Sequence, residues 1–183
     1  SDSDTIVVRS GTYDERLWIE KQLTLIGENV STTVLQPTAA PQWGVYDVKI
    51  LAGGVVLRNF TLDFNGPLDD RNGSSGDTGL VVSDMNGPAV TGVQIVDNIV
   101  FTGDGDTAVE TGKNANVSGL LIRGNVFYGD ADGSGEGIYI NPGPGTNIQV
   151  DNNEFYGNVF SGVCVETSHV NVSNNIVDRD VAF

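Results

Sequence analysis

A short repeat of the form aliphatic-x-aliphatic-x-x-Asn constrains the fold of this 183-residue chain more than any other feature. Its four clear copies end on asparagines at positions 98, 125, 153 and 175, which are 27, 28 and 22 residues apart. The copies read VQIVDN (93–98), LLIRGN (120–125), IQVDNN (148–153) and VNVSNN (170–175). The segment GVVLRN, which ends at Asn59, is a looser copy that is one residue shorter. Such a period is typical of solenoid proteins, in which each copy is one structural unit.

Each copy predicts two short strands joined by a turn. Apolar and polar residues alternate over only a few positions, which indicates a strand with one buried face. The asparagine then turns the chain, because its side chain can bond nearby backbone groups and Asn tolerates unusual backbone angles. The second strands are expected at GLVVSD (79–84), TAVETG (107–112), GIYINP (137–142) and GVCVET (162–167). Strand, asparagine turn, strand and loop together form one coil of a parallel β-helix.

The sequence therefore predicts an all-β fold, a single-stranded parallel β-helix of about 7 to 8 coils, with residues 1–183 as one domain and almost no helix. Equivalent residues of neighbouring coils lie about 4.8 Å apart, so position in the repeat predicts position in space. The repeat asparagines should stack at one corner and bond one another: Asn98, Asn125, Asn153 and Asn175. Two inward aliphatic ladders should be Val93, Leu120, Ile148 and Val170, and Ile95, Ile122, Val150 and Val172.

The N-terminal segment TIVVRSGTYDERLWIEKQLTLIGEN (5–29) resembles the opening coils of the pectate-lyase-like right-handed parallel β-helix superfamily. IVVRSGTY and LTLIGEN carry the resemblance, which includes NosD-type and CASH repeats and, more distantly, pectin methylesterases. It implies a right-handed coil but no particular activity, because one scaffold hosts many unrelated sites. Relatives usually close the first coil with a helix, whereas strand-like residues begin here at Thr5. Both terminal caps are therefore expected to be missing.

Acidic insertions fall at one place in the repeat, after the asparagine strand and before the second strand. They are DFNGPLDDRNGSSGD (63–77), FTGDGD (101–106) and FYGDADGSGEG (127–137). Stacking of the coils should gather their carboxylates along one edge, and hard cations with oxygen ligands relieve such repulsion. The sequence thus predicts a Ca²⁺ site formed by Asp104, Asp106, Asp130, Asp132 and Glu136, with a solvated acidic loop as the alternative.

A candidate ligand site lies on the second strands. An outward row is expected at Val81, Ala108, Tyr139 and Cys164, followed by Ser83, Glu110, Asn141 and Glu166. An aromatic ring flanked by carboxylate and amide groups can hold a sugar by stacking and hydrogen bonding. Ordinary sheet surface is the alternative. Arg123 is a candidate base for a polysaccharide lyase, or else a charge partner of Asp97 or Asp151 on adjacent coils.

The composition of the chain excludes some classes of binding partner. The formal charge of -15 would repel a nucleic-acid backbone or an anionic membrane surface and favours cations. No apolar run approaches the roughly 20 residues of a membrane span. A single cysteine, Cys164, allows no intrachain disulfide. Five Asn-x-Ser/Thr sequons predict glycosylation, although an Asn- and Ser-rich chain contains some by chance: Asn29, Asn59, Asn72, Asn116 and Asn171.

Two functions fit this pattern. The first is an extracellular or cell-surface structural or adhesive solenoid that binds cations and stacks end to end, because uncapped ends expose strand edges to another chain. The alternative is a carbohydrate-binding or polysaccharide-modifying module of a larger secreted protein. The catalytic motifs of pectate lyases, polygalacturonases, methylesterases and epimerases are absent from the sequence. Enzyme activity is therefore left undecided, with lyase or epimerase chemistry as the form it would take.

Overall fold

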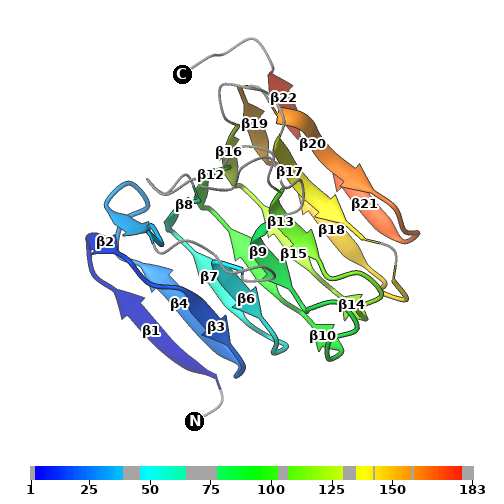
Figure 1. Ribbon diagram of the computed structural model, residues 1–183, viewed down its shortest axis with the longest axis horizontal. Coiled ribbons are helices and arrows are strands. Elements are labelled where there is room, and N and C mark those ends of the chain that lie inside the picture. Colours follow the sequence, from blue (N-terminus) through cyan, green and yellow to red (C-terminus); the bar gives the residue numbers. More distant parts are fainter. Residues whose placement is uncertain are drawn as a thin grey trace.

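The computed structural model describes residues 3–38, 46–64, 78–102, 107–129, 135–141, 143–157 and 159–178. Within these ranges the chain forms strands and turns, and no helix is long and apolar enough to cross a membrane. All strand pairs are parallel, and successive coils follow one another along the long axis of the molecule (Figure 1).

Three long sheets form the walls of the molecule. Sheet A comprises β1 (Asp4–Val8), β4 (Leu23–Gly27), β7 (Val56–Arg58), β11 (Gln94–Val96), β15 (Leu121–Arg123), β18 (Ile148–Asp151) and β21 (Val170–Ser173). Sheet B comprises β2 (Gly11–Tyr13), β5 (Thr33–Leu35), β8 (Thr61–Asp63), β12 (Ile99–Phe101), β16 (Val126–Tyr128), β19 (Glu154–Tyr156) and β22 (Ile176–Asp178). Sheet C comprises β3 (Leu17–Ile19), β6 (Val48–Ile50), β9 (Thr78–Val82), β13 (Thr107–Thr111), β17 (Gly135–Ile140) and β20 (Val159–Val165). A small fourth sheet pairs β10 (Val90–Thr91) with β14 (Val117–Ser118).

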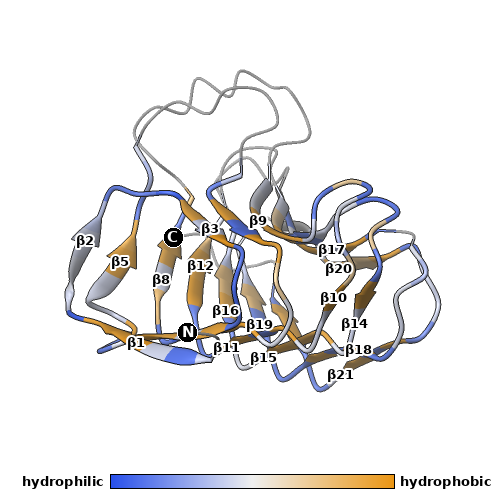
Figure 2. Cartoon of the chain, turned by 90° about the horizontal axis from the view of Figure 1, so that it is seen from below, coloured by the Kyte–Doolittle hydropathy of each residue, from blue (hydrophilic) through white to orange (hydrophobic). Residues whose placement is uncertain are grey.

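Among the described residues, the coils add strands to sheets A, B and C in turn, up to β22 in sheet B, so the chain is the predicted parallel β-helix. Sheets A and B each contain 7 strands, which agrees with the expected number of coils. The three parallel sheets surround one interior, and their inward side chains are buried there. Figure 2 shows the hydrophobic residues on the strands and hydrophilic residues concentrated in the turns.

Both predicted aliphatic ladders are confirmed on sheet A. Ile95 pairs with Ile122, Ile122 with Val150, and Val150 with Val172. The first three of these residues are fully buried, whereas Val172 in the last coil is 46% exposed. Sheet B adds two stacked inward rings, Phe127 and Phe155, whose centroids lie 4.8 Å apart and which are both fully buried. In the core, similar side chains of adjacent coils thus contact one another, aliphatic on aliphatic and aromatic on aromatic, at the spacing of neighbouring strands.

The asparagine ladder at the corner between sheets A and B is also confirmed. Asn98 Nδ2 donates to Asn125 Oδ1, Asn125 Nδ2 to Asn153 Oδ1, and Asn153 Nδ2 to Asn175 Oδ1, each at 3.0 Å. Each acceptor oxygen also receives the backbone N–H of the preceding asparagine in the ladder, at 2.9 to 3.0 Å. A second amide hydrogen of Asn125 reaches the Ile95 carbonyl at 2.9 Å. Each coil that carries a ladder asparagine therefore satisfies buried backbone groups of its neighbour.

Two details of the turn differ from the sequence prediction. The residue in the left-handed region is the one before each ladder asparagine, with φ of 55° at Asp97, 53° at Asn152 and 55° at Asn174. The ladder residue itself supplies the hydrogen bonds. In the third coil Arg58 pairs with Val96, so Asn59 lies level with Asp97 rather than with Asn98. That copy of the repeat is not one residue shorter: Phe60 occupies the ladder position, and its backbone N–H bonds Asn98 Oδ1 at 3.0 Å.

Candidate functional site

The outer face of sheet C carries the row of side chains that suits a ligand site best. In-register pairing places Trp18, Lys49, Val81, Glu110, Tyr139 and Cys164 on successive coils. The sequence prediction placed Ala108 in this row, which is wrong. Thr107 pairs with Thr78, so Glu110 lies opposite Val81 and next to Tyr139. Ala108 is instead fully buried in the core.

The adjacent outward row also differs by one member. Gly112, rather than Glu110, follows Ser83 and precedes Asn141 in the stack. Asn141 holds the turn at this point, because its backbone N–H bonds Thr111 Oγ1 at 3.0 Å and its Nδ2 bonds the Thr111 carbonyl at 2.6 Å. The corrected register places Glu110 directly beside Tyr139.

Glu110 is the most perturbed carboxyl group on this face. Burial raises its pKa to about 7, and the negative charges of Asp84 and Glu136 act in the same direction. Hydrogen bonds from Thr78 and Asn141 lower the pKa but do not offset burial. A carboxyl group with such a pKa is partly protonated at neutral pH and can donate or accept a proton there.

Tyr139 and Glu166 form a second polar pair beside Glu110. Burial raises the pKa of Tyr139 to about 12, assisted by the hydrogen bond to Glu166 and by its charge. The phenol therefore stays protonated and donates to the exposed carboxylate of Glu166. Burial, with the charges of Glu136 and Glu166, also raises the pKa of Cys164, so its thiol is not an activated nucleophile.

The N-terminal half of the face is built around Lys49. Its ammonium group bonds Asp84 and lies 5.7 Å from the ring centre of Trp18 and 5.4 Å from that of Tyr46. Burial alone would raise the pKa of Asp84, but bonds from Lys49, the Met85 N–H and Tyr46 lower it. The indole of Trp18 is 64% exposed. This end of the face thus presents an aromatic surface next to a neutralised ion pair.

The sequence prediction missed Trp18, Tyr46, Lys49 and Asp84 as members of this face. Trp18 and Lys49 pair directly with each other and align with Val81. Alignment of the N-terminal coils with the repeat would have found both, but those coils lack the ladder asparagine that marks the register.

Arg123 lies on a different wall from the other predicted ligand residues. It projects from sheet A, is exposed, and its Nε bonds Asp151 Oδ2 at 3.1 Å. The expectation of a charge partner on an adjacent coil is confirmed for Asp151. A role for Arg123 beside Glu110 and Tyr139 is not compatible with this position.

The predicted Ca²⁺ ligands fall mostly outside the described residues, which is the case for Asp104, Asp106, Asp130 and Asp132. Glu136 is described, is half-buried, and accepts a weak hydrogen bond of 3.4 Å from Thr107 Oγ1. In the part of the chain that the structure describes, no three His, Cys, Asp or Glu side chains are grouped to hold a metal ion. Calcium binding stays a prediction.

The sequons have different accessibilities. Asn29, Asn116 and Asn171 are exposed, Asn59 is half-buried, and Asn72 lies outside the described residues. The Oδ1 of Asn29 accepts the Ser31 N–H at 2.9 Å within a local turn. Exposure is compatible with glycosylation at the first three positions, and the modification itself stays a prediction.

Comparisons with known proteins concern the fold. No family model matches the chain, and neither does any curated protein. Among solved structures it is similar to the crystal structure of pectin methylesterase in complex with hexasaccharide VII, with a TM-score of 0.46 and 14% sequence identity. The match covers 92% of this chain and 59% of that chain, so the present chain spans about three fifths of that protein. The sheet topology by itself identifies the chain as a parallel β-helix.

Proposed function

We propose that the protein is an extracellular or cell-surface β-helix module that binds a polysaccharide along the outer face of sheet C. The observation that carries this proposal is the row in which Glu110, Tyr139 and Cys164 succeed one another beside Asn141 and Glu166. Aromatic rings that alternate with hydrogen-bonding groups suit sugars, whose ring faces are apolar and whose edges carry hydroxyl groups.

The geometry of a β-helix favours an extended ligand. Each coil presents its outward side chain about 4.8 Å from the next, so Glu110, Tyr139 and Cys164 offer contacts in a line. Val81, which is fully buried, separates them from Trp18 and Lys49 at the other end of the row. Trp18 and Tyr139 provide stacking surfaces, while Glu110, Asn141 and Glu166 provide acceptors and donors for hydroxyl groups. A chain of sugars laid parallel to the solenoid axis would contact several coils at once.

Glu110 gives this face the capacity for acid–base chemistry. Its raised pKa of about 7 suits proton transfer to or from a bound sugar near neutral pH. A polysaccharide-modifying activity is the finer form of the proposal, and its substrate would be the same glycan that the face binds.

Affinity electrophoresis in gels that contain polygalacturonate, alginate, xylan or glucomannan tests the binding proposal. We expect retardation of the wild-type protein in at least one gel, and weaker retardation of Tyr139→Ala and Trp18→Ala in that gel. Arg123→Gln is the matched control, because Arg123 is exposed but belongs to sheet A. Equal mobility of wild type and Tyr139→Ala in every gel would refute the site. Product analysis of the retained glycan with wild type and Glu110→Gln tests turnover.

We also propose that the acidic segments that precede strands of sheet C bind Ca²⁺. The proposal is supported by the oxygen-rich spacing of Asp130, Asp132 and Glu136 and by the net charge of -15. A cation that binds only the folded protein must raise the midpoint of thermal unfolding. We therefore expect a higher midpoint in millimolar CaCl₂ than in EDTA, and equal midpoints would refute calcium binding.

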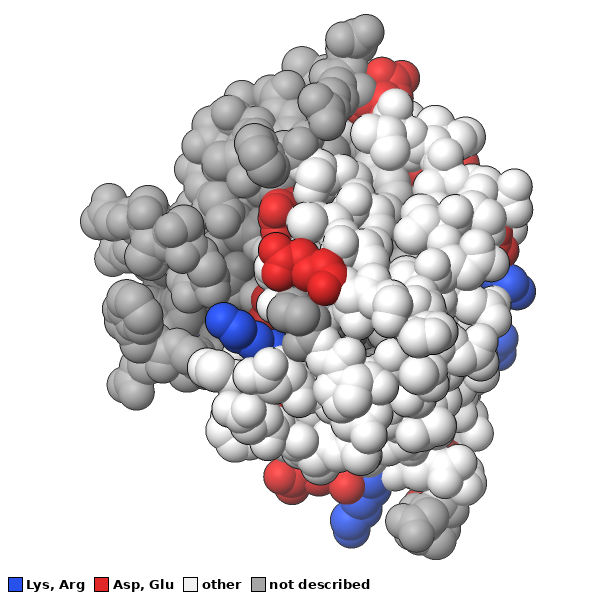
Figure 3. Space-filling view, turned by 90° about the vertical axis from the view of Figure 1, so that its right-hand side faces the viewer, with Lys and Arg blue, Asp and Glu red and all other residues white. Residues whose placement is uncertain are grey.

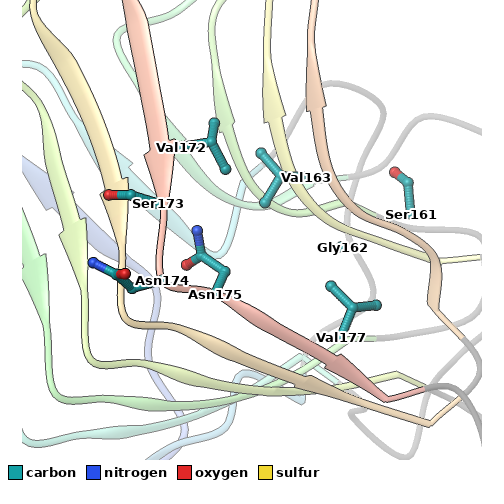
Figure 4. Close-up of a pocket in the computed structure, with 8 residues that line it drawn as sticks. All are labelled: Ser161, Gly162, Val163, Val172, Ser173, Asn174, Asn175 and Val177. Atoms are coloured by element: carbon teal, nitrogen blue, oxygen red, sulfur yellow. The ribbon is translucent and has the colours of Figure 1, made fainter.

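End-to-end assembly is a second proposal, and one observation favours it. Strands β20, β21 and β22 are the last members of their sheets among the described residues. Next to them a hollow of about 540 Å³ is lined by Val163, Val172 and Val177 together with small polar residues (Figure 4). Figure 3 views the side with β20 and β21, where residues other than Lys, Arg, Asp and Glu cover most of the described surface, with an acidic cluster near the centre and further charged residues toward the edges.

The opposite end of the described coils has complementary character. Ile6 is 47% exposed and Val7 is 62% exposed on β1, the first strand of sheet A. A second copy that places its β1 next to β21 would continue the parallel sheet and cover both apolar ends. Sedimentation velocity tests this, with a concentration-dependent increase in mass expected for wild type. Val172→Lys and Val7→Lys should each reduce it, whereas a wild-type monomer at all concentrations would refute assembly.

A further inference from the structure

The outer face of sheet B carries a feature that the proposed site on sheet C does not use. Three outward rings stack on successive coils: Phe101 on Tyr128 with centroids 5.1 Å apart, and Tyr128 on Tyr156 with centroids 5.8 Å apart. Their interplanar angles are 19° and 25°. These rings are half-buried and are distinct from the inward Phe127 and Phe155 pair. We call Phe101, Tyr128 and Tyr156 the outer aromatic ladder.

A hollow adjoins the end of the outer aromatic ladder that lies toward the N-terminal coils. It measures about 430 Å³, within the range of small-ligand sites, and is lined by Ser31, Val34, Thr61, Ile99, Phe101 and Tyr128. The hollow arises because the outward side chains become smaller toward the N-terminal coils. Asp63 precedes Phe101 in this row, so the ladder has no fourth ring on that side of Phe101. In the neighbouring row Val34, Thr61 and Ile99 align and form a low floor.

The chemistry of the hollow suits a sugar ring. Phe101 offers an aromatic wall to the apolar C–H face of a sugar, and the floor is largely aliphatic. The Oγ1 of Thr61 donates to the Val30 carbonyl at 2.7 Å and keeps its lone pairs available to a ligand hydroxyl. Asp63, which lies next to Phe101 in the outward row, accepts from Gln36 Nε2 at 2.7 Å. Carboxylate acceptors at the edge of an aromatic platform bind sugar hydroxyl groups strongly.

The charged side chains on sheet B favour neutral over anionic glycans. None of the seven described strands of sheet B contains Lys or Arg, and the outward positions include Asp63, Glu154 and Asp178. The Glu154 carboxylate already accepts the hydroxyl of Tyr156 at 2.6 Å. A uronate or sulfated glycan would meet only negative charge on this wall, whereas a neutral glycan would not be repelled.

We propose that the outer face of sheet B is a second glycan-binding site, specific for neutral sugars, with one ring seated in the hollow beside Phe101 and the chain continuing over Tyr128. This site goes beyond the proposed function, because sheets B and C are different walls of the coil and share no lining residue. Its binding is therefore separable from that of the Tyr139 face.

Isothermal titration calorimetry with cellohexaose, xylohexaose and mannohexaose tests the proposal. We expect at least one neutral hexasaccharide to bind wild type, and binding to Phe101→Ala to be at least about tenfold weaker. Phe101→Tyr should keep the affinity, because it retains the stacking face. Val34→Glu should abolish binding without removal of any ring, since it places a charge on the floor of the hollow. Circular dichroism melts verify that each variant folds.

Tyr139→Ala separates this site from the one on sheet C. Neutral hexasaccharide binding that survives in Tyr139→Ala and is lost in Phe101→Ala and Val34→Glu supports the second site. Loss in Tyr139→Ala with full binding by Phe101→Ala assigns the glycan to sheet C and overturns the inference. Absence of binding by all three hexasaccharides to wild type also overturns it, even where the charged polysaccharides still bind the face of sheet C.

Discussion

Replacement of Asn125 by alanine tests the energetic role of the asparagine ladder. In the folded protein Asn125 Oδ1 accepts the backbone N–H and the Nδ2 of Asn98, both at 3.0 Å. Its Nδ2 donates to the Ile95 carbonyl at 2.9 Å. Alanine would leave two buried donors and one buried acceptor without these partners. Each such group costs about 1–2 kcal/mol when water cannot replace the partner, so we expect a loss of roughly 3–6 kcal/mol in the free energy of unfolding.

Asn175→Ala is the matched control. Asn175 makes the same types of bond, to the Asn153 N–H, the Asn153 Nδ2 and the Val150 carbonyl. It is half-buried rather than fully buried, so water can replace part of what is lost. We expect a cost of about 1–2 kcal/mol for this variant.

Urea unfolding followed by circular dichroism measures both variants, with fluorescence as a second probe because a solenoid can unfold in more than one step. The two probes must give coincident transitions before the free energies are compared. A loss below about 1 kcal/mol for Asn125→Ala, or a loss no larger than that of Asn175→Ala, would refute the view that buried hydrogen bonds of the ladder hold adjacent coils together.

Two further predictions concern a turn and the face of sheet C. A Cβ at Gly145 would lie 2.0 Å from the Val117 carbonyl oxygen, so Gly145→Ala should lower the urea midpoint. Gly92→Ala should lower it less, because a Cβ there meets nothing within 4 Å and only the φ of 72° opposes alanine. Equal midpoints for the two variants would contradict this. Because the folded protein holds the Glu110 proton more tightly than the unfolded chain, the free energy of unfolding should fall by roughly 1–3 kcal/mol as pH rises from 4.5 to about 7. Glu110→Gln should lack this fall in urea titrations at each pH, and identical profiles would disprove the assignment.

Inward and outward positions of the coil are under different packing constraints. Inside the coil, like residues stack because each position has one neighbour above and one below, as at Ile95, Ile122 and Val150. Outward positions carry no such packing constraint, so one coil can present Glu110 and the next Tyr139 without change to the scaffold. The same freedom allows the aromatic rings of sheet B and the polar groups of sheet C to occur on one solenoid.

The fold class, the asparagine ladder and both inward aliphatic ladders could be predicted from the sequence. These features recur every coil, and hydrophobic alternation reports directly which side chains face the core. The sequence placed Asn59 wrongly because an asparagine can serve either as the left-handed residue of the turn or as the hydrogen-bonding residue after it. Only the pairing of Arg58 with Val96 distinguished the two.

Which side chains lie next to one another on the outer faces became clear only from the tertiary structure. Glu110 lies beside Tyr139 because Thr107 pairs with Glu136, and the short strand TAVET contains too little alternation to fix that register. Arg123 proved to belong to another wall because three sheets, rather than two faces, surround the core. The aromatic ladder of sheet B joins residues 27 and 28 positions apart, Phe101 with Tyr128 and Tyr128 with Tyr156. Such contacts arise only when coils stack, because the spacing along the chain depends on loop length whereas the spacing in space is set by hydrogen bonding between strands.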